Sequence, residues 1–311
     1  MVSTPVRICL AAIILFPALS FGQGFVVDHV RVFDGERTIE HASVLVRAGR
    51  IAAVGRADRL ATDLPIIDGS GRTLLPGLID AHTHIQSRLD LQKSLVFGVT
   101  TDLSLHMPPQ LAKELENGQD GQADLLSAGF AATAPGGHGT EYGFPVPTLT
   151  APSQAQTWVD DRIDPILRKY LLPEDVALLQ RNIAKATPND CARAMNATAV
   201  LASRGVPILA GTDQHNPGTA PGASVHGELA LLVEAGLTPL QALRAATSAA
   251  AKAFRLGDRG RIAPGLRADL LLVQGDPTSD IHATRNIVAV WKGGVEFDRD
   301  AWLNYMNAGT H

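Results

Sequence analysis

The sequence predicts a mixed α/β protein, and three patterns along the chain support this fold class. The middle of the chain, residues 76–257, alternates short apolar runs with helical periodicity, which is typical of parallel βα units in a barrel or an open sheet. Short strand patterns bounded by glycine turns occupy both ends of the chain. The composition, 45% hydrophobic and 19% charged over 311 residues, is that of a folded globular protein.

The N-terminus has the features of a secretory signal. Arg7 precedes an apolar run over 8–21, and small residues follow up to Gly22. The run is too short to span a bilayer comfortably. We therefore expect residues 1–22 to be a signal peptide, the protein to be exported to the periplasm or secreted, and the mature chain to have no membrane contact.

The two ends of the chain are expected to build one domain. Residues 42–46 alternate with period two, and the apolar runs at 268–273 and 287–291 end in turns. Closely spaced short strands of this kind favour a small β-sandwich. We expect it to combine residues 23–75 and 258–300.

The middle segment is expected to alternate strands and helices. Four strands are predicted, at 78–84, 99–103, 125–130 and 206–212. Helices are predicted at 88–97, 108–116, 224–235, 240–247 and over most of 155–205, with breaks near Pro165, Pro173 and Pro188. Thr238 before Pro239 is a good N-cap followed by a proline at the first helical position.

Two histidines at the end of the first predicted strand are candidate metal ligands. Side chains alternate along a strand, so His82 and His84 point to the same face, roughly 6–7 Å apart. Imidazole nitrogens at a strand end can converge on zinc or a similar ion. A His-x-His pair by itself is weak evidence, because many such pairs lie on surfaces without a metal.

An acidic residue follows the last predicted strand. Asp213 comes directly after the apolar run at 208–210 and Gly211-Thr212. A carboxylate at the carboxyl end of a barrel strand can bind a metal and accept a proton from metal-bound water. The alternative is that Asp213 caps the turn at 216–218.

Three further histidines are candidates for substrate binding. His138 lies in a glycine-rich loop, where the backbone can approach a ligand closely. His215 and His226 follow Asp213 on the loop and the start of the next helix. The alternative for each is an incidental polar residue.

Composition and missing motifs exclude several function classes. The net charge of -4 and the aromatic content of 5% argue against a nucleic-acid partner. The sequence has no nucleophile elbow, no phosphate-binding loop and no cysteine pair that could hold a structural zinc. A small-molecule or peptide-like substrate is the expected partner, and an assembly of identical copies is left open.

Four motifs, in order along nearly the whole mature chain, resemble the amidohydrolase superfamily. The likeness is strongest to its imidazolonepropionase-like and Xaa-Pro dipeptidase-like branch of metal-dependent hydrolases. The motifs are LPGLIDAHTH at 75–84, GGHG at 136–139, AGTD at 210–213 and GRIAPG at 260–265 followed by ADL at 268–270.

This resemblance implies a fold and a reaction. The fold is a TIM-like barrel that carries one or two divalent metals, beside a sandwich made from both chain ends. His82 and His84 are implied to bind the first metal, with zinc expected, and Asp213 to bind it and serve as general base. The implied reaction is hydrolysis of an amide or cyclic amide bond, including that of a dipeptide, and related barrels also catalyse deamination.

The chain departs from the family pattern in its middle. Such enzymes also use a bridging Lys or Glu and two more histidines, but no histidine lies between Gly139 and Asp213, and Lys169 and Lys185 fall in helical patterns. The middle segment has 182 residues, whereas a barrel of this type needs about 250. We therefore expect an incomplete barrel over 76–257, and a catalytically impaired deletion remnant is the alternative to an active hydrolase.

Overall fold

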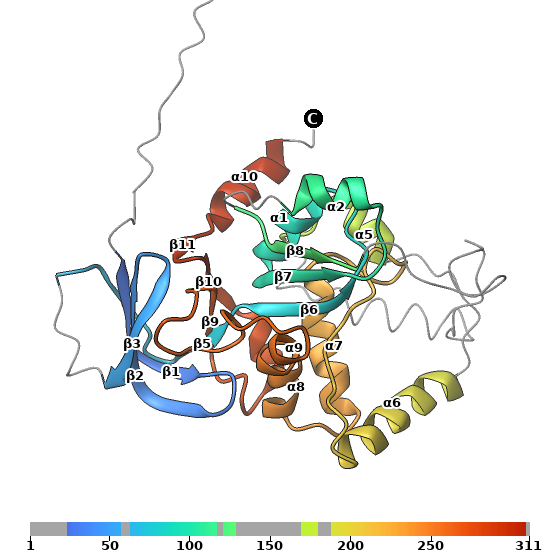
Figure 1. The fold of residues 1–311 in the computed structure, drawn as a ribbon, viewed down its shortest axis with the longest axis horizontal. Helices are drawn as coiled ribbons and strands as arrows, with labels where there is room; N and C mark the ends of the chain where they lie inside the picture. The colour runs from blue at the N-terminus through green and yellow to red at the C-terminus, as the bar shows by residue number, and fades with distance from the viewer. Residues whose placement is uncertain (1–23, 57–62, 117–120, 129–168, 180–187, 309–311) are drawn as a thin grey trace, which may run out of the picture.

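The computed structural model describes residues 24–56, 63–116, 121–128, 169–179 and 188–308, which form two β-sheets with helices around them (Figure 1). The mixed α/β class is confirmed. Residues 1–22 lie outside the described residues, so the signal peptide stays a prediction. Within the described ranges, no helix has the length and apolar character needed to cross a membrane.

The larger sheet combines strands from both ends of the chain. Its eight strands are β1 (Phe25–Phe33), β2 (Thr38–Arg47), β3 (Arg50–Arg56), β4 (Ile66–Asp68), β5 (Arg72–Pro76), β9 (Leu270–Gln274), β10 (Ile287–Lys292) and β11 (Val295–Glu296). Seven follow the order β11-β10-β9-β5-β1-β2-β3, and β4 pairs with β1. The antiparallel β5–β9 pair joins the N-terminal and C-terminal segments. The two ends therefore form one sheet, and the sandwich over 23–75 and 258–300 stays a prediction.

Apolar residues hold this sheet together. Phe25 at the start of β1 stacks on Trp291 of β10, with ring centroids 5.2 Å apart. Both side chains are buried, as are Val44 and Leu272 in the same cluster. Such aromatic and β-branched residues favour strands because they pack well on a pleated surface. Contacts of this kind link sequence segments more than 200 residues apart.

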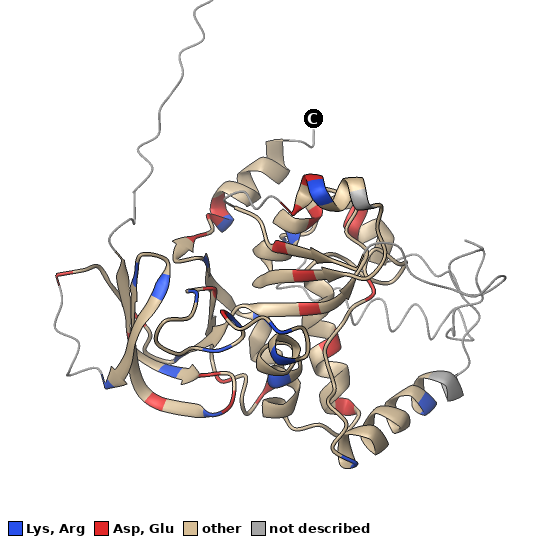
Figure 2. Ribbon diagram, viewed as in Figure 1, with Lys and Arg blue, Asp and Glu red and all other residues tan. Residues whose placement is uncertain are grey.

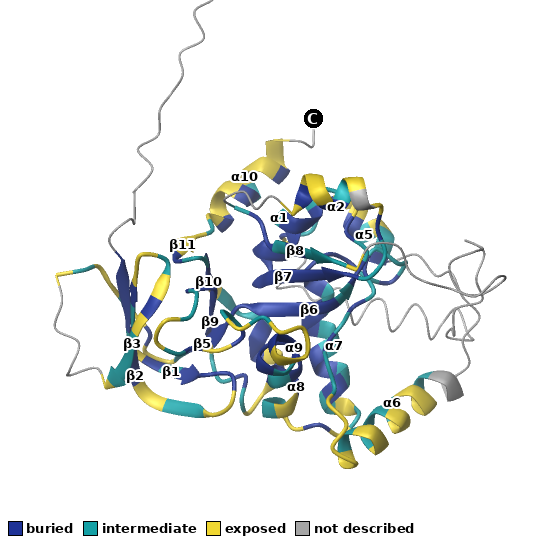
Figure 3. Ribbon diagram, in the orientation of Figure 1, coloured by how far each residue is buried: buried dark blue, intermediate teal, exposed yellow. Residues whose placement is uncertain are grey.

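The smaller sheet carries the first three strands predicted for the middle segment. These are β6 (Leu78–Thr83), β7 (Val99–Ser104) and β8 (Asp124–Ser127), paired in parallel in that order. The connections contain α1 (Arg88–Val96) and α2 (Pro109–Leu115). Figure 3 shows β6 and β7 as mostly buried. In parallel strands the carboxyl ends meet at one edge, which is where the chemistry of such sheets gathers.

The fourth predicted strand, 206–212, is not a regular strand in the structure, so that expectation is wrong. The segment still lies beside β6, because the amide of Ala81 donates to the carbonyl of Ala210 at 2.9 Å. The amide of Thr212, however, donates to the side chain of Asp80 at 3.1 Å. Because the Thr212 amide donates to this side chain, it does not donate to the backbone of a neighbouring strand.

Six further α-helices and one 3₁₀ helix lie in the described residues. They are α5 (Pro173–Leu179), α6 (Pro188–Ser203), α7 (Ala223–Glu234), α8 (Pro239–Ala245), α9 (Ser248–Ala253) and α10 (Arg299–Ala308), with a 3₁₀ helix η2 at Ile281–Arg285. Thr238 caps α8, where its side chain accepts from the amide of Gln241, as predicted. Helix α10 was not predicted from the sequence. Its Trp302 is buried and donates from Nε1 to the carbonyl of Tyr170. In Figure 3 α6 is largely exposed.

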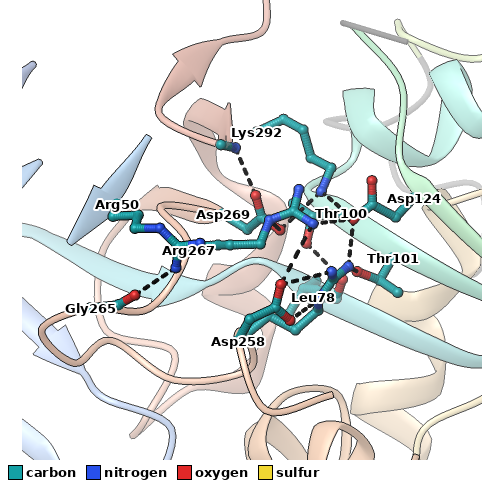
Figure 4. Close-up of polar contacts among 12 residues, drawn as sticks. Arg50, Leu78, Thr100, Thr101, Asp124, Asp258, Gly265, Arg267, Asp269 and Lys292 are labelled. Atoms are coloured by element: carbon teal, nitrogen blue, oxygen red, sulfur yellow. Dashed lines mark hydrogen bonds and ion pairs between the residues drawn. The ribbon is translucent and has the colours of Figure 1, made fainter. Parts of the chain in front are cut away.

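A cluster of ion pairs joins the two sheets (Figure 4). Asp124 at the start of β8 receives three cations on Oδ2: Arg259 Nη1 at 2.5 Å, Arg267 Nη1 at 2.6 Å and Lys292 Nζ at 2.9 Å. Lys292 also donates to Asp269 at 2.9 Å. Away from this cluster, Lys and Arg are interspersed with Asp and Glu along the ribbon in Figure 2. The cluster connects β8 to the strands β9 and β10.

Asp124 should make stability depend on pH. Burial would raise the pKa of Asp124, but the charges of Lys292, Arg267 and Arg259 outweigh burial and lower the pKa from 3.8 to about 2. Because the folded-state pKa is depressed, the stabilisation is present above about pH 4 and is lost as the pH falls toward 2. Asp124→Asn should lower the free energy of unfolding by about 1–3 kcal/mol at pH 7, with the difference from wild type fading below about pH 4.

Denaturant unfolding at several pH values measures this difference. The exposed Asp63 provides the control, because Asp63→Asn should change neither the stability at pH 7 nor its pH dependence. A difference between wild type and Asp124→Asn that stays constant from pH 7 to pH 2 would contradict the assignment.

Candidate metal centre

His82 and His84, the His-x-His pair, lie at the carboxyl end of β6, and Asp213 lies beside them. The amide of Asp213 donates to the carbonyl of His82 at 2.8 Å, and the amide of His84 donates to the carbonyl of Gln214. An isolated parallel bridge joins Thr83 and Gln214. The backbone alignment therefore brings two segments, far apart in the sequence, to one edge of the smaller sheet.

The three side chains converge. His84 Nε2 is 2.8 Å from Asp213 Oδ1, and His82 Nε2 is 3.3 Å from the same oxygen. The two imidazole rings are 5.3 Å apart between centroids. One ligand atom from each residue lies within 4.8 Å of the others. The side chains are 44% (His82), 29% (His84) and 45% (Asp213) exposed, so a ligand can reach the cluster from solvent.

The charges of these groups are coupled. The hydrogen bond that His84 donates to Asp213 raises the pKa of His84, and burial opposes this without cancelling it. Burial would raise the pKa of Asp213, but the hydrogen bond and charges of the histidines lower it overall. Two imidazole nitrogens and one carboxylate oxygen are a donor set that suits zinc and similar divalent ions. Among the described residues this is the one group of three or more His, Cys, Asp or Glu side chains close enough to share an ion.

Comparisons with known proteins identify the relatives of this chain. The sequence pattern of the amidohydrolase family matches residues 157–296. An adenine deaminase of Lysinibacillus sphaericus is 24% identical over 342 residues, covering 87% of this chain and 57% of the deaminase. An imidazolonepropionase of Deinococcus deserti is 42% identical over 98 residues, covering 30% of this chain and 24% of the relative.

Solved structures have a similar fold. A Xaa-Pro dipeptidase with bound methionine in the active site gives a TM-score of 0.66 at 17% identity, covering 89% of this chain and 100% of that chain. Ochratoxinase of A. niger gives the same TM-score and identity, covering 89% of this chain and 96% of that one. The chain belongs to the amidohydrolase superfamily. It spans 57% of the length of the adenine deaminase relative.

In this amidohydrolase superfamily member, a buried carboxylate holds together the two segments that carry the candidate ligands. Asp80 accepts from Thr212 Oγ1 at 2.6 Å and from the Thr212 amide at 3.1 Å. It also accepts from the amide of His82 at 3.2 Å. Burial raises the pKa of Asp80 to about 7, although these three hydrogen bonds oppose the rise. Asp80 thus sits between the strand that carries the histidines and the segment that carries Asp213.

A third histidine near this cluster, His106, lies just beyond β7 and was not among the predicted site residues. Its ring is 6.5 Å from the ring of His84 between centroids. The imidazole of His84 also hydrogen bonds to the backbone of His106, which contributes to its raised pKa. A backbone partner for a second ring nitrogen fixes the orientation and tautomer of a ligating histidine. The available signal was the position of His106 shortly after a predicted strand, at the same sheet edge as His84.

The three histidines suggested for substrate binding have different surroundings. His215 Nε2 lies 2.9 Å from Asp90 Oδ1. In the sequence, His215 is two residues beyond Asp213. His226 is 1% exposed, and its Nε2 lies 3.0 Å from the carbonyl of Phe97, so it makes a packing contact between α7 and the end of α1. His138 lies outside the described residues. A binding role for each stays a prediction.

The Asp80–Thr212 contact should control metal affinity. Thr212→Val keeps the side-chain shape but removes the hydroxyl that donates to Asp80 at 2.6 Å. Loss of such an outer partner typically weakens metal binding by about 10–100-fold. Competition with a chromogenic chelator measures the zinc Kd of the purified variant.

Thr212→Ser is the matched control, because it keeps the hydroxyl and should bind zinc with nearly the wild-type Kd. If Thr212→Val bound zinc as tightly as wild type while remaining folded, Asp80 would have no part in positioning the ligands.

Proposed function

We propose that this chain is a metal-dependent hydrolase of carbon–nitrogen bonds, acting on an amide, a cyclic amide or a dipeptide. In this proposal His82, His84 and Asp213 hold a divalent ion, with zinc the expected metal. The observation that carries the proposal is the convergence of three ligand atoms within 4.8 Å at the carboxyl end of β6. Superfamily membership supports the reaction class.

Each side chain has a separate proposed role in this reaction. A bound divalent ion would lower the pKa of a coordinated water and polarise the scissile carbonyl. Asp213 is the proposed general base, because the neighbouring histidines keep its pKa low and its carboxylate ionised at neutral pH. His84 is held between Asp213 and the backbone of His106, which limits the reorganisation that binding requires.

A deaminase is the second candidate. The match to an adenine deaminase extends over 87% of this chain, a larger share than the 30% matched by the imidazolonepropionase. Hydrolytic deamination needs a similarly activated water, but the water replaces an exocyclic amino group, which leaves as ammonia. Ammonia release from adenine, compared with amine release from dipeptides, separates the two reactions.

A catalytically impaired remnant is the third candidate, because the middle segment 76–257 has fewer residues than a full barrel needs. The chain covers 57% of the deaminase relative. The parallel sheet has three strands in the described residues, β6, β7 and β8. The expected incomplete barrel stays a prediction. A remnant would bind zinc at His82, His84 and Asp213 without turning over any substrate.

Turnover by the zinc-loaded chain tests the hydrolase proposal. A panel of dipeptides, N-acyl amino acids, cyclic amides and adenine should contain at least one substrate. Asp213→Asn should lower kcat by about 100-fold or more, because it removes the proton acceptor. His84→Ala should abolish stoichiometric zinc binding, measured by elemental analysis.

His282→Ala is the matched control, since His282 is an exposed histidine on η2. It should leave kcat and the zinc content unchanged. A folded, zinc-loaded wild-type chain with no turnover across the panel would overturn the hydrolase proposal in favour of the remnant.

A further inference from the structure

Five polar side chains on β6, on β7 and at Gln214 are buried close to the proposed metal centre. We call this set the polar layer. All of its members are 0% exposed; they are Asp80, Thr83, Asp102, Ser104 and Gln214. Neither the histidines nor Asp213 belong to it.

The strand register puts these residues on one face. Asp80 of β6 pairs with Asp102 of β7, and Thr83 pairs with Ser104. On the other side of β6, Thr83 pairs with Gln214 in an isolated parallel bridge. Paired residues of parallel strands point to the same side of a sheet. The side chain of Gln214 spans β6, because its Nε2 lies 3.5 Å from Asp102 Oδ1.

Four oxygens of the polar layer have no hydrogen-bond partner in the described part of the chain. They are Asp102 Oδ2, Gln214 Oε1, Thr83 Oγ1 and Ser104 Oγ. Buried polar atoms in folded proteins are almost always partnered, because an unpaired one loses its hydration without replacement. These four unpartnered oxygens come from β6, from β7 and from Gln214 beside β6. Oxygen atoms without a hydrogen-bond donor indicate a bound cation.

The charge of the polar layer is uncompensated by the described side chains around it. The neighbouring cation on α1, Lys93, is paired with Asp175 at 2.8 Å. His215 faces Asp90. The charges that act on Asp102 come from Asp90 and the other buried carboxylate of the layer, and both are negative. Besides these, α1 presents the hydroxyl of Ser94 to Asp102. Burial raises the pKa of Asp80 to about 7 and the pKa of Asp102 well above its usual value, so a bound cation would favour the ionised forms that burial disfavours.

We propose that the polar layer binds a hard divalent cation, Ca²⁺ or Mg²⁺, separate from the metal centre. Asp102, Gln214, Thr83 and Ser104 supply the oxygen ligands, and Asp80 supplies the second negative charge. An all-oxygen set of carboxylate, amide and hydroxyl groups suits these ions, whereas zinc prefers nitrogen and sulfur ligands. The cation ties β6, β7 and the segment around Gln214 together beneath the zinc ligands. This assignment does not depend on the proposed hydrolase activity.

Thermal unfolding of the full chain after EDTA treatment tests the proposal. Choline, sodium, potassium, magnesium and calcium chloride are compared at equal ionic strength. Mg²⁺ or Ca²⁺ at a hundredfold excess over Kd should raise Tm by on the order of 5 °C, and the monovalent salts should not. The same rise should persist in His84→Ala, which lacks a ligand of the metal centre.

Variants locate the effect. Asp102→Asn should abolish the divalent-specific rise in Tm, and Ser104→Ala should shift its midpoint to about tenfold higher cation concentration. Ser104→Ala also keeps the test valid if Asp102→Asn does not fold. The control Asp300→Asn, at an exposed position, should keep the full rise. The proposal fails if no divalent-specific rise occurs, if potassium or sodium gives the same rise, or if Asp102→Asn retains it.

Discussion

Asp80 connects two parts of the chain that are 132 residues apart in sequence. Its carboxylate accepts both donors of Thr212 and the amide of His82, and it is fully buried. This contact fixes how the segment before Asp213 lies against β6. The backbone of Gly211 lies so close to β6 that a Cβ at this position would come within 2.8 Å of the Cβ of His82. The convergence of the three proposed metal ligands follows from this alignment.

The frame around this contact comes from both ends of the chain. β5 leads directly into β6, and β5 pairs with β9 near the C-terminus. The cations around Asp124 then join β8 to the same C-terminal strands. The smaller sheet is thus anchored to the larger one at both of its outer strands, which positions the carboxyl edge where His82 and His84 lie.

Much of this arrangement could be predicted from the sequence. Strand alternation placed His82 and His84 on one face, and turn patterns located β2, β9 and β10 of the larger sheet. The link to Asp213 came from family resemblance, because spacing alone does not reveal contacts 129 residues apart. The expectation of a strand at 206–212 was wrong, since the Thr212 amide binds a side chain. The positions of Asp80 and His106 in the site could not be predicted from the sequence, because they depend on tertiary contacts with other segments.

Zinc K-edge X-ray absorption of the purified, zinc-loaded chain tests the central claim most directly, namely that His82, His84 and Asp213 share one ion. The account predicts a first shell with two imidazole nitrogens at about 2.0–2.1 Å and carboxylate oxygen at about 2.0–2.2 Å. In His84→Ala the spectrum should lose imidazole scattering. A first shell of oxygen alone, or an identical spectrum in wild type and His84→Ala, would contradict it.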